Sequence, residues 1–347
     1  MTCFPICGGV RFGKFMISLI IPTRNRADLL EKTLESVAIQ TFPVSQFEVI
    51  VVDNGSTDNT PEVVKDFTGR LKNLRYEYEP VPGLHAGRHR GLKVALGDIL
   101  VYADDDIRAT PSWLSAIAEN FVDPEIAMVG GNNYPDFQGE VPGWLDRLWA
   151  RHFMGGHVID TLSILSLPGE RRDLSPYLVW GCNLSIRKQV LLDAGGFHPD
   201  GMPRELIRFR GDGETHVSRY VSEKKLRCVF DPHASVYHAV TPERMTFDYF
   251  WQRSFNQGIS DSYTQLRNKS LKASLSAYPR AIARRLLGPV RHILKYAKGN
   301  DPGLNDPELL ELQKFMQEGY REGFKYHQRM YREDPEVRAW VHKPNYF

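Results

Sequence analysis

The sequence has few cysteines and no long hydrophobic run. Its 347 residues include 4 cysteines, at positions 3, 7, 182 and 228, which are too scattered for a disulfide framework and form no paired C-x-x-C zinc pattern. No stretch reaches the roughly 18 consecutive apolar residues that indicate a transmembrane helix. Reduced thiols and the lack of such a run favour a cytoplasmic protein.

A clear excess of charge and the common glycine-rich phosphate loops are also missing. Lys and Arg total 44 against 42 for Asp and Glu, a formal net charge of +2, which argues against a nucleic-acid partner. No G-x-x-x-x-G-K-[ST] occurs, which excludes a P-loop. The first expected strand leads into Pro22-Thr23-Arg24-Asn25-Arg26, where dinucleotide-binding folds place G-x-G-x-x-G, so that fold is disfavoured too.

From residue 16 to about residue 130 the chain alternates short apolar runs with longer amphipathic ones, which is typical of βα units on a parallel sheet. The expected strands are Ile17–Ile21, Val49–Val52 and Ile99–Ala103, and the expected helices are Ala27–Ile39 and Thr60–Phe67. Ligands of open α/β sheets bind in the crevice outside the carboxyl ends of the strands. The polar residues that follow these strands are therefore the first candidates for a functional site.

Carboxylates follow two of these strands. The triplet Asp104-Asp105-Asp106 comes directly after an apolar run, and a hard divalent cation such as Mg²⁺ or Mn²⁺ would stabilise three such neighbours. A solvated acidic turn is the alternative. Asp53 ends another strand and opens an Asn-Gly turn, so it either accepts hydrogen bonds from a base or ribose or forms an Asx-turn.

The C-terminal part differs in composition. Between Ser262 and Asn300 there are nine Lys or Arg residues and no Asp or Glu. Apolar residues recur there every three or four positions, which predicts an amphipathic helical stripe interrupted near Pro279 and Pro289. This stripe either packs on the rest of the protein with its basic side chains in water or contacts anionic lipid. A further helix is expected around 307–331.

Four segments, taken in order, resemble the inverting family 2 glycosyltransferases of the GT-A fold. They are IIPTRNR at 20–26, VVDNGSTD at 51–58, GLHAGRHRG at 83–91 and DDD at 104–106, with further matches at 181–183, 195–197, 213–215 and 236–238. The resemblance implies an α/β fold whose central, mostly parallel mixed sheet is flanked by helices, plus a C-terminal helical extension. It also implies a division of the chain. Residues 1–15 form an N-terminal extension, 16–261 the GT-A domain and 262–347 an amphipathic helical region; within the domain, 16–130 is the nucleotide-binding half and 131–261 the acceptor-side half.

The resemblance also implies roles for individual residues. The nucleotide-binding residues would be Pro22, Thr23, Arg24, Asp53, Arg88, Asp104 and Asp105. The metal ligands would be Asp106, Asp104 and His238, with the register inside the acidic triplet left open. A satisfied core or edge position is the alternative for His238. The chain departs from the family at His89, where asparagine is commoner.

The catalytic base that the resemblance implies is Glu214, with Asp212 as the fallback because Gly213 stands where the family has a preceding acid. A carboxyl group that is enclosed with its substrate can have its pKa raised towards neutrality, and we expect this of Glu214. Asn183 and Trp180 are expected to line the sugar and acceptor cleft, since amides suit hydroxyl groups and aromatic faces suit pyranose rings. A core position is the alternative for Trp180.

The implied reaction is the metal-dependent transfer of a sugar, with inversion, from a nucleotide-sugar to a saccharide or lipid-linked acceptor in glycan or polysaccharide biosynthesis. By family frequency the donor is a UDP-sugar, and the cofactor is Mn²⁺ or Mg²⁺. Peripheral contact with the inner face of the membrane would run through 262–300. Three other interpretations stay open: a non-catalytic nucleotide-sugar-binding module on a degenerate GT-A fold, a nucleotidyltransferase, and a membrane-surface adaptor.

Overall fold

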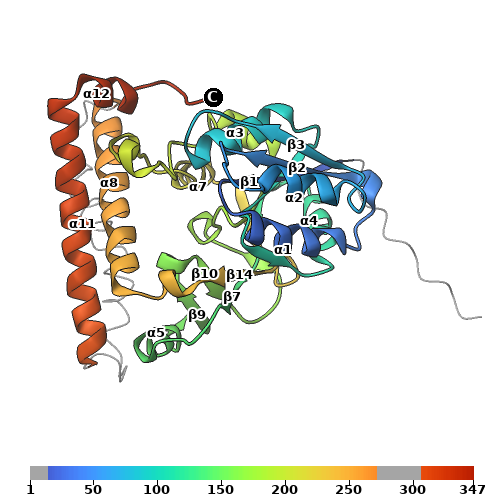
Figure 1. Cartoon of the computed structure of the whole chain (residues 1–347), viewed down its shortest axis with the longest axis horizontal. Coiled ribbons are helices and arrows are strands. Elements are labelled where there is room, and N and C mark those ends of the chain that lie inside the picture. Colours follow the sequence, from blue (N-terminus) through green and yellow to red (C-terminus); the bar gives the residue numbers. More distant parts are fainter. Residues whose placement is uncertain (1–14, 272–305) are drawn as a thin grey trace, which may run out of the picture.

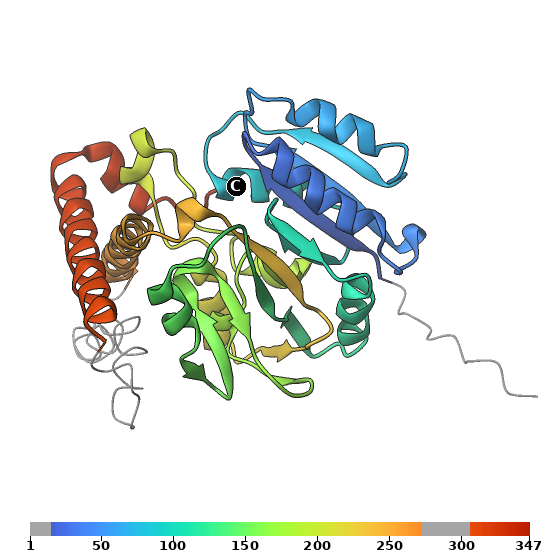
Figure 2. The same cartoon turned by 60° about the horizontal axis from the view of Figure 1, so that its bottom comes forward.

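The computed structural model describes residues 15–271 and 306–347, and its centre consists of two β-sheets (Figures 1 and 2). One sheet has eight strands in the order β11-β13-β6-β12-β4-β1-β2-β3, and the other has six in the order β5-β14-β7-β10-β9-β8. The strands of the larger sheet are β1 (Ile17–Thr23), β2 (Phe47–Asp53), β3 (Leu74–Tyr78), β4 (Ile99–Ala103), β6 (Ile126–Gly130), β11 (Arg172–Asp173), β12 (Asn183–Arg187) and β13 (Arg227–Phe230). Those of the smaller sheet are β5 (Ile107–Ala109), β7 (Asn133–Phe137), β8 (His152–Phe153), β9 (Gly156–Ile159), β10 (Ile164–Ser166) and β14 (Val236–Val240).

Helices cover both faces of the larger sheet. They are α1 (Ala27–Ala38), α2 (Thr60–Phe67), α3 (Leu84–Val94), α4 (Trp113–Phe121), α6 (Lys188–Asp193) and α7 (Thr215–Glu223). In β1, Leu19 and Ile21 pack with α1, α2 and α4, whereas Ile20 packs with α3, α6 and α7. Every residue of β1 and β2 is therefore buried, which is why these strands are continuous apolar runs in the sequence.

The arrangement confirms the predicted fold class. Strands β3, β2, β1 and β4 are parallel to one another, while β12 runs antiparallel between β4 and β6, so the sheet is mixed. The expected strands and the two expected N-terminal helices occur, with ends that shift by two residues at most.

The smaller sheet brings a distant segment to the end of β4. Strand β14 pairs antiparallel with β5, and His238 lies opposite Ile107 in that pairing. Because Ile107 directly follows the acidic triplet, this register places the His238 backbone beside Asp106, and the amide of Ala239 donates a hydrogen bond to the Asp106 carbonyl at 2.9 Å. Helix α5 (Gly143–Trp149) packs near β9 at the far side of this sheet.

A C-terminal helical region completes the structure, as predicted. Helices α8 (Phe247–Leu271) and α11 (Pro307–Glu333) lie side by side and are parallel, and the short α12 (Pro335–Val341) follows (Figure 1). Glycines permit the close approach, since a Cβ atom at Gly258 would lie 2.2 Å from the Tyr320 carbonyl oxygen and one at Gly323 would lie 1.9 Å from that of Phe255. Among the described helices, none combines the length and hydrophobicity needed to cross a bilayer.

The predicted domain limits stay predictions. The limit between 261 and 262 falls inside α8, so the GT-A domain and the helical region share a continuous helix. Most of the basic stripe predicted at 262–300 lies outside the described residues, as does nearly all of the extension at 1–15. Peripheral membrane contact through this stripe also stays a prediction.

Candidate active site

A cleft of about 290 Å³ lies beyond the carboxyl end of β4, between the two sheets and the start of α7. Most of its lining is charged: four carboxylates face five arginines and one histidine. The lining residues are Arg26, Leu84, Arg88, Asp104, Asp106, Ser163, Gly181, Cys182, Asp200, Gly201, Arg210, Glu214, His238, Arg244, Tyr249 and Arg253. Of the predicted site residues, the cleft thus brings together Arg88, Asp104, Asp106, Glu214 and His238.

The three acids of the triplet have different surroundings. Asp105 points away from the cleft and is buried: Thr23 Oγ1 donates a hydrogen bond to it at 2.7 Å, and an Arg26 guanidinium nitrogen lies at 2.7 Å. Burial raises the pKa of Asp105 to about 7, although Arg26 opposes the rise. This geometry gives Asp105 a structural environment and leaves Asp104 and Asp106 facing the cleft.

Asp106 is enclosed by two arginines and a histidine. Its carboxylate lies 2.6 Å from Arg26, 3.2 Å from Arg244 and 3.2 Å from His238 Nε2. Burial alone would raise the pKa of Asp106, but His238 and the two arginines hold it well below its usual range. Asp104 is less restrained, because its side chain is 30% exposed and its nearest cation, Arg88, is 3.7 Å away. Burial raises the pKa of Asp104, with Arg88 opposing.

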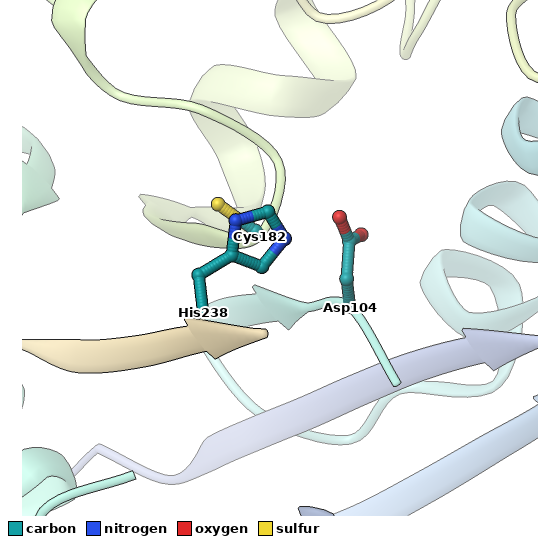
Figure 3. A group of neighbouring side chains, drawn as sticks. All are labelled: Asp104, Cys182 and His238. Atoms are coloured by element: carbon teal, nitrogen blue, oxygen red, sulfur yellow. The ribbon is translucent and has the colours of Figure 1, made fainter. Parts of the chain in front are cut away.

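Three side chains are placed as a metal-ligand group. Ligand atoms of Asp104, Cys182 and His238 all lie within 4.8 Å of one another, and they come from the end of β4, the residue before β12, and β14 (Figure 3). The buried His238 Nδ1 has no hydrogen-bond partner among the described residues. A carboxylate and a neutral imidazole are ligands that Mn²⁺ accepts, so these residues fit a divalent cation. Cys182 is a candidate ligand that the sequence analysis missed.

Arg88 connects the two sides of the cleft. This fully buried arginine of α3 donates hydrogen bonds to Asp200 at 3.3 Å and to Glu214 at 3.1 Å, besides its contact with Asp104. A Cβ atom at position 181 would lie 1.9 Å from an Arg88 guanidinium nitrogen, so the glycine at 181 leaves the space that Arg88 occupies. The buried Arg88 thereby links Asp104, a member of the metal-ligand group, to Glu214.

Glu214 precedes the first residue of α7, and 27% of its side chain is exposed to the cleft. The expected rise of its pKa is wrong: burial favours a rise, but the Arg88 guanidinium, together with a backbone hydrogen bond and Arg253, lowers the pKa of the carboxyl. Asp212, the fallback, lies in another cluster, where His198, Arg219 and Thr264 contact its carboxylate at 2.5, 2.5 and 2.6 Å. Asp212 is absent from the cleft lining.

Asp200 is a second acid that the sequence analysis missed. A Cβ atom at Gly213 would lie 2.6 Å from an Asp200 carboxylate oxygen, so Asp200 occupies the space beside the glycine that replaces the family's preceding acid. Burial raises the pKa of Asp200 to about 7, with Arg88 opposing. In the sequence, the only signal was that Gly213 stands where the family has an acid. The fold shows that the Asp200 carboxylate lies beside this glycine.

The predicted nucleotide-binding residues of β1 and β2 lie beside the cleft rather than in its lining. Thr23 and Asp53 are opposite one another in the parallel pair, and Arg24 is exposed just beyond them. Asp53 is buried, and it accepts hydrogen bonds from the Ser56 amide and the Tyr76 hydroxyl, each at 2.7 Å. Both the predicted Asx-type contact and a position at the sheet edge are therefore present.

Two predicted cleft residues, Asn183 and Trp180, are placed elsewhere. Asn183 is buried in β12, where it accepts a hydrogen bond from Trp113 Nε1 and donates one to the Ala234 carbonyl, both at 3.0 Å. Trp180 packs against the apolar clusters on either face of the sheet. Neither residue is in the cleft lining, so the expectation that they line it is not met.

Comparison with known proteins finds a family match in roughly the N-terminal half of the chain. Residues 18–186 match the family model described as glycosyl transferase family 2. The chain is 36% identical over 124 residues to glycosyltransferase AglE of Haloferax volcanii, which covers 35% of this chain and 41% of AglE. It is 24% identical over 280 residues to the glucosyl-dolichyl phosphate glucuronosyltransferase of the same organism, covering 76% of this chain and 81% of that protein.

These likenesses differ in extent. The chain spans 41% of the length of AglE and 27% of the length of the validoxylamine A glucosyltransferase of Streptomyces hygroscopicus. The mannosyltransferase PcManGT of Pyrobaculum calidifontis, solved with GDP-Man and Mn²⁺, is similar in structure, with a TM-score of 0.56 at 19% identity, over 93% of this chain and 88% of that one. This likeness confirms the fold, and the family match confirms the predicted resemblance to family 2 glycosyltransferases over residues 18–186.

Proposed function

We propose that the protein is an inverting, metal-dependent glycosyltransferase, a proposal that starts from the match of residues 18–186 to the glycosyl transferase family 2 model. The donor is a nucleotide-sugar, a UDP-sugar in the first instance, and the acceptor is a saccharide or a lipid-linked saccharide. The observation that carries the proposal is the cleft itself. It places the carboxylate of Glu214 and the group of Asp104 and His238 around one space, with Arg88 in contact with both acids.

Glu214 is proposed as the general base. Because Arg88 lowers the pKa of Glu214, its carboxylate is ionised at neutral pH and can accept the proton of an acceptor hydroxyl group as the new glycosidic bond forms. The acceptor oxygen then attacks the anomeric carbon from the face opposite the nucleotide, and the configuration inverts. Asp200 and Arg88 hold Glu214 in place for this step.

The other side of the cleft is proposed to hold the donor. Asp104 and His238, with Asp106 and Cys182 beside them, would hold Mn²⁺ or Mg²⁺. When bound, such an ion stabilises the negative charge of a diphosphate leaving group. Arg26 and Arg244 fix Asp106 and add positive charge. Pro22, Thr23, Arg24 and Asp53 are proposed to contact the nucleoside, at the sheet edge beside the cleft.

Two relatives guide the choice of substrates. GDP-Man and Mn²⁺ are present in the PcManGT complex, so GDP-sugars belong in the donor screen with UDP-sugars. The glucuronosyltransferase that resembles 76% of this chain has a name that specifies a dolichyl phosphate-linked acceptor, which supports a lipid-linked acceptor here.

A donor screen tests the proposal. We would measure thermal stability and donor hydrolysis with UDP-, GDP- and dTDP-sugars, with Mn²⁺ and again with a chelator. Ligand binding should raise the melting temperature by mass action, for one nucleotide class and only with metal. Slow donor hydrolysis should be lost in Glu214→Gln. If no nucleotide-sugar stabilises the metal-loaded protein, the proposed function is wrong.

A further inference from the structure

Two arginines of the cleft differ from the other three. Arg210 follows the 3₁₀ segment η4 (Arg204–Phe209), Arg253 lies in the second turn of α8, and both line the cleft within electrostatic range of Glu214. Arg26, Arg88 and Arg244 are each bound to carboxylates of the cleft. Within residues 15–271 and 306–347, neither the Arg210 nor the Arg253 side chain forms a salt bridge or a hydrogen bond, and Arg210 Nε is buried without a partner.

These two cations lie within electrostatic range of one another and of Glu214. Burial lowers the pKa of Arg210, Asp200 and Glu214 oppose this effect, and the charge of Arg253 adds to it. Arg253 also contributes to the lowered pKa of Glu214. Two neighbouring, partly buried guanidinium groups that form no salt bridge with the described residues cost free energy, and an anion between them would offset that cost.

We propose that Arg210 and Arg253 bind a phosphate group of the acceptor, beside the hydroxyl group that Glu214 deprotonates. The inference rests on the proposed function and narrows its acceptor to a phosphorylated compound. The two arginines lie on the Glu214 side, while Arg26 and Arg244 surround Asp106 on the donor side. Two guanidinium forks match the charge and the several oxygens of a phosphate, whereas a carboxylate would balance only one of them.

Binding of inorganic phosphate tests the site directly. The protein is first saturated with Mn²⁺ and with whichever of UDP, GDP or dTDP binds it, so that the donor diphosphate site is filled, and phosphate is then titrated calorimetrically. Wild type should bind phosphate, and Arg253→Gln and Arg210→Gln should each weaken this binding about tenfold or more, the usual scale for a lost charge-assisted hydrogen bond. In each variant, the loss of phosphate affinity should be about tenfold larger than any loss of nucleotide affinity.

Arg321→Gln is the matched control. It removes one positive charge from an exposed position on α11, outside the cleft, and should bind phosphate as wild type does. The inference is overturned if wild type binds the nucleotide but no phosphate, or if both cleft variants lose nucleotide and phosphate affinity equally. The second result would assign the arginines to the donor diphosphate. If wild type binds no nucleotide at all, the proposed function fails instead.

The source of the phosphate is resolved by acceptor probes. Glucose 1-phosphate in solution and an isoprenoid phosphate glucoside in detergent micelles share the phosphate and differ in the lipid, and octyl glucoside has neither phosphate nor isoprenoid chain. Transfer to one or both phosphorylated probes, with a KM that rises about tenfold in Arg253→Gln, supports the inference. Equal transfer to octyl glucoside, with the same KM in wild type and variant, overturns it.

Discussion

The two sides of the cleft are constructed differently. On the donor side, Asp104 and Asp106 follow β4, and Asp53 ends β2, so a buried parallel sheet sets their positions. On the Glu214 side, the charged residues come from the start of a helix, a 3₁₀ segment and turns in which Gly201 and Gly213 have positive φ angles of 55° and 50°. A sheet edge can be located from a hydrophobic pattern, whereas turns and helix starts are brought together only by tertiary packing.

The two sides also differ in how their charges are balanced. Each acid of the triplet Asp104-Asp105-Asp106 has an arginine or histidine within 4 Å, so the charge of the triplet is largely balanced before a ligand binds. The Glu214 side has two arginines without such partners among the described residues. If the comparison is right, variants on the donor side should change metal and nucleotide binding, and variants on the other side should change the chemical step and the acceptor.

The largest effect is expected from Glu214→Gln. Loss of a general base should lower kcat for transfer by roughly 10²–10⁴, while the affinity for donor stays close to that of wild type. Single-turnover kinetics with the donor identified by the screen would measure the rate of transfer, and calorimetry would measure the affinity for the donor. Glu223→Gln, at the exposed end of the same helix, is the matched control and should transfer normally. Wild-type turnover in Glu214→Gln would remove this residue from the mechanism.

Asp104→Asn should have the next largest effect, and on binding rather than on proton transfer. The substitution removes a charged oxygen ligand from the group formed with Cys182 and His238, so Mn²⁺ affinity should fall by about 100-fold. Titration followed by electron paramagnetic resonance measures this. Asp105→Asn is the informative contrast, because Asp105 contacts Thr23 and Arg26 away from the cleft and should mainly lower stability. If Asp105→Asn loses more Mn²⁺ affinity than Asp104→Asn, then Asp105 and not Asp104 is the metal ligand.

Asp212→Asn should change stability more than chemistry. The Asp212 carboxylate is held by His198 and Arg219, which keep its pKa well below the usual value although burial opposes them. Its stabilisation is therefore present above about pH 4, the unfolded-state pKa, and is lost as the pH falls through the folded-state value.

Urea unfolding should show a loss of about 3 kcal/mol for this variant at pH 7 and a smaller loss at acid pH. Asp66→Asn, at an exposed position of α2, should change the stability little. A fall in kcat as large as that of Glu214→Gln would instead make Asp212 the base.

The contrast between the two sides explains which parts of the site were predictable. Asp104, Asp106 and Asp53 follow apolar runs, and that pattern alone locates them at one edge of the sheet. Glu214 and His238 required a family resemblance, because a helix start and a strand pairing across 131 positions carry no local signal. Asp200 could not be foreseen, since its role depends on the space beside Gly213.

Asn183 shows the opposite error. The amide of Asn183 is expected to bind sugar hydroxyl groups, yet it accepts a hydrogen bond from Trp113 and donates one to the Ala234 carbonyl inside the core. Polar residue type alone does not distinguish a binding role from the satisfaction of buried polar groups. The same limit applies to the pKa of Glu214, whose sign depends on Arg88, a residue 126 positions away in the sequence.

Gly181→Ala tests whether Arg88 couples the two sides of the cleft. The added methyl group would lie 1.9 Å from an Arg88 guanidinium nitrogen and would force this buried side chain to move, at a cost of about 1–3 kcal/mol in stability. Gly69→Ala, where nothing lies within 4 Å of the new Cβ atom, is the matched control.

The pH dependence of kcat/KM shows whether Arg88 controls the pKa of Glu214 or only fills space beside position 181. Arg88 is the main charge that lowers the pKa of Glu214, so its displacement lets burial raise that pKa. Because transfer needs ionised Glu214, the acid limb of the kcat/KM profile should move to higher pH in Gly181→Ala and stay in place in Gly69→Ala. An acid limb that stays in place despite the loss of stability would mean that Arg88 does not control the base, and the two sides of the cleft would then act independently.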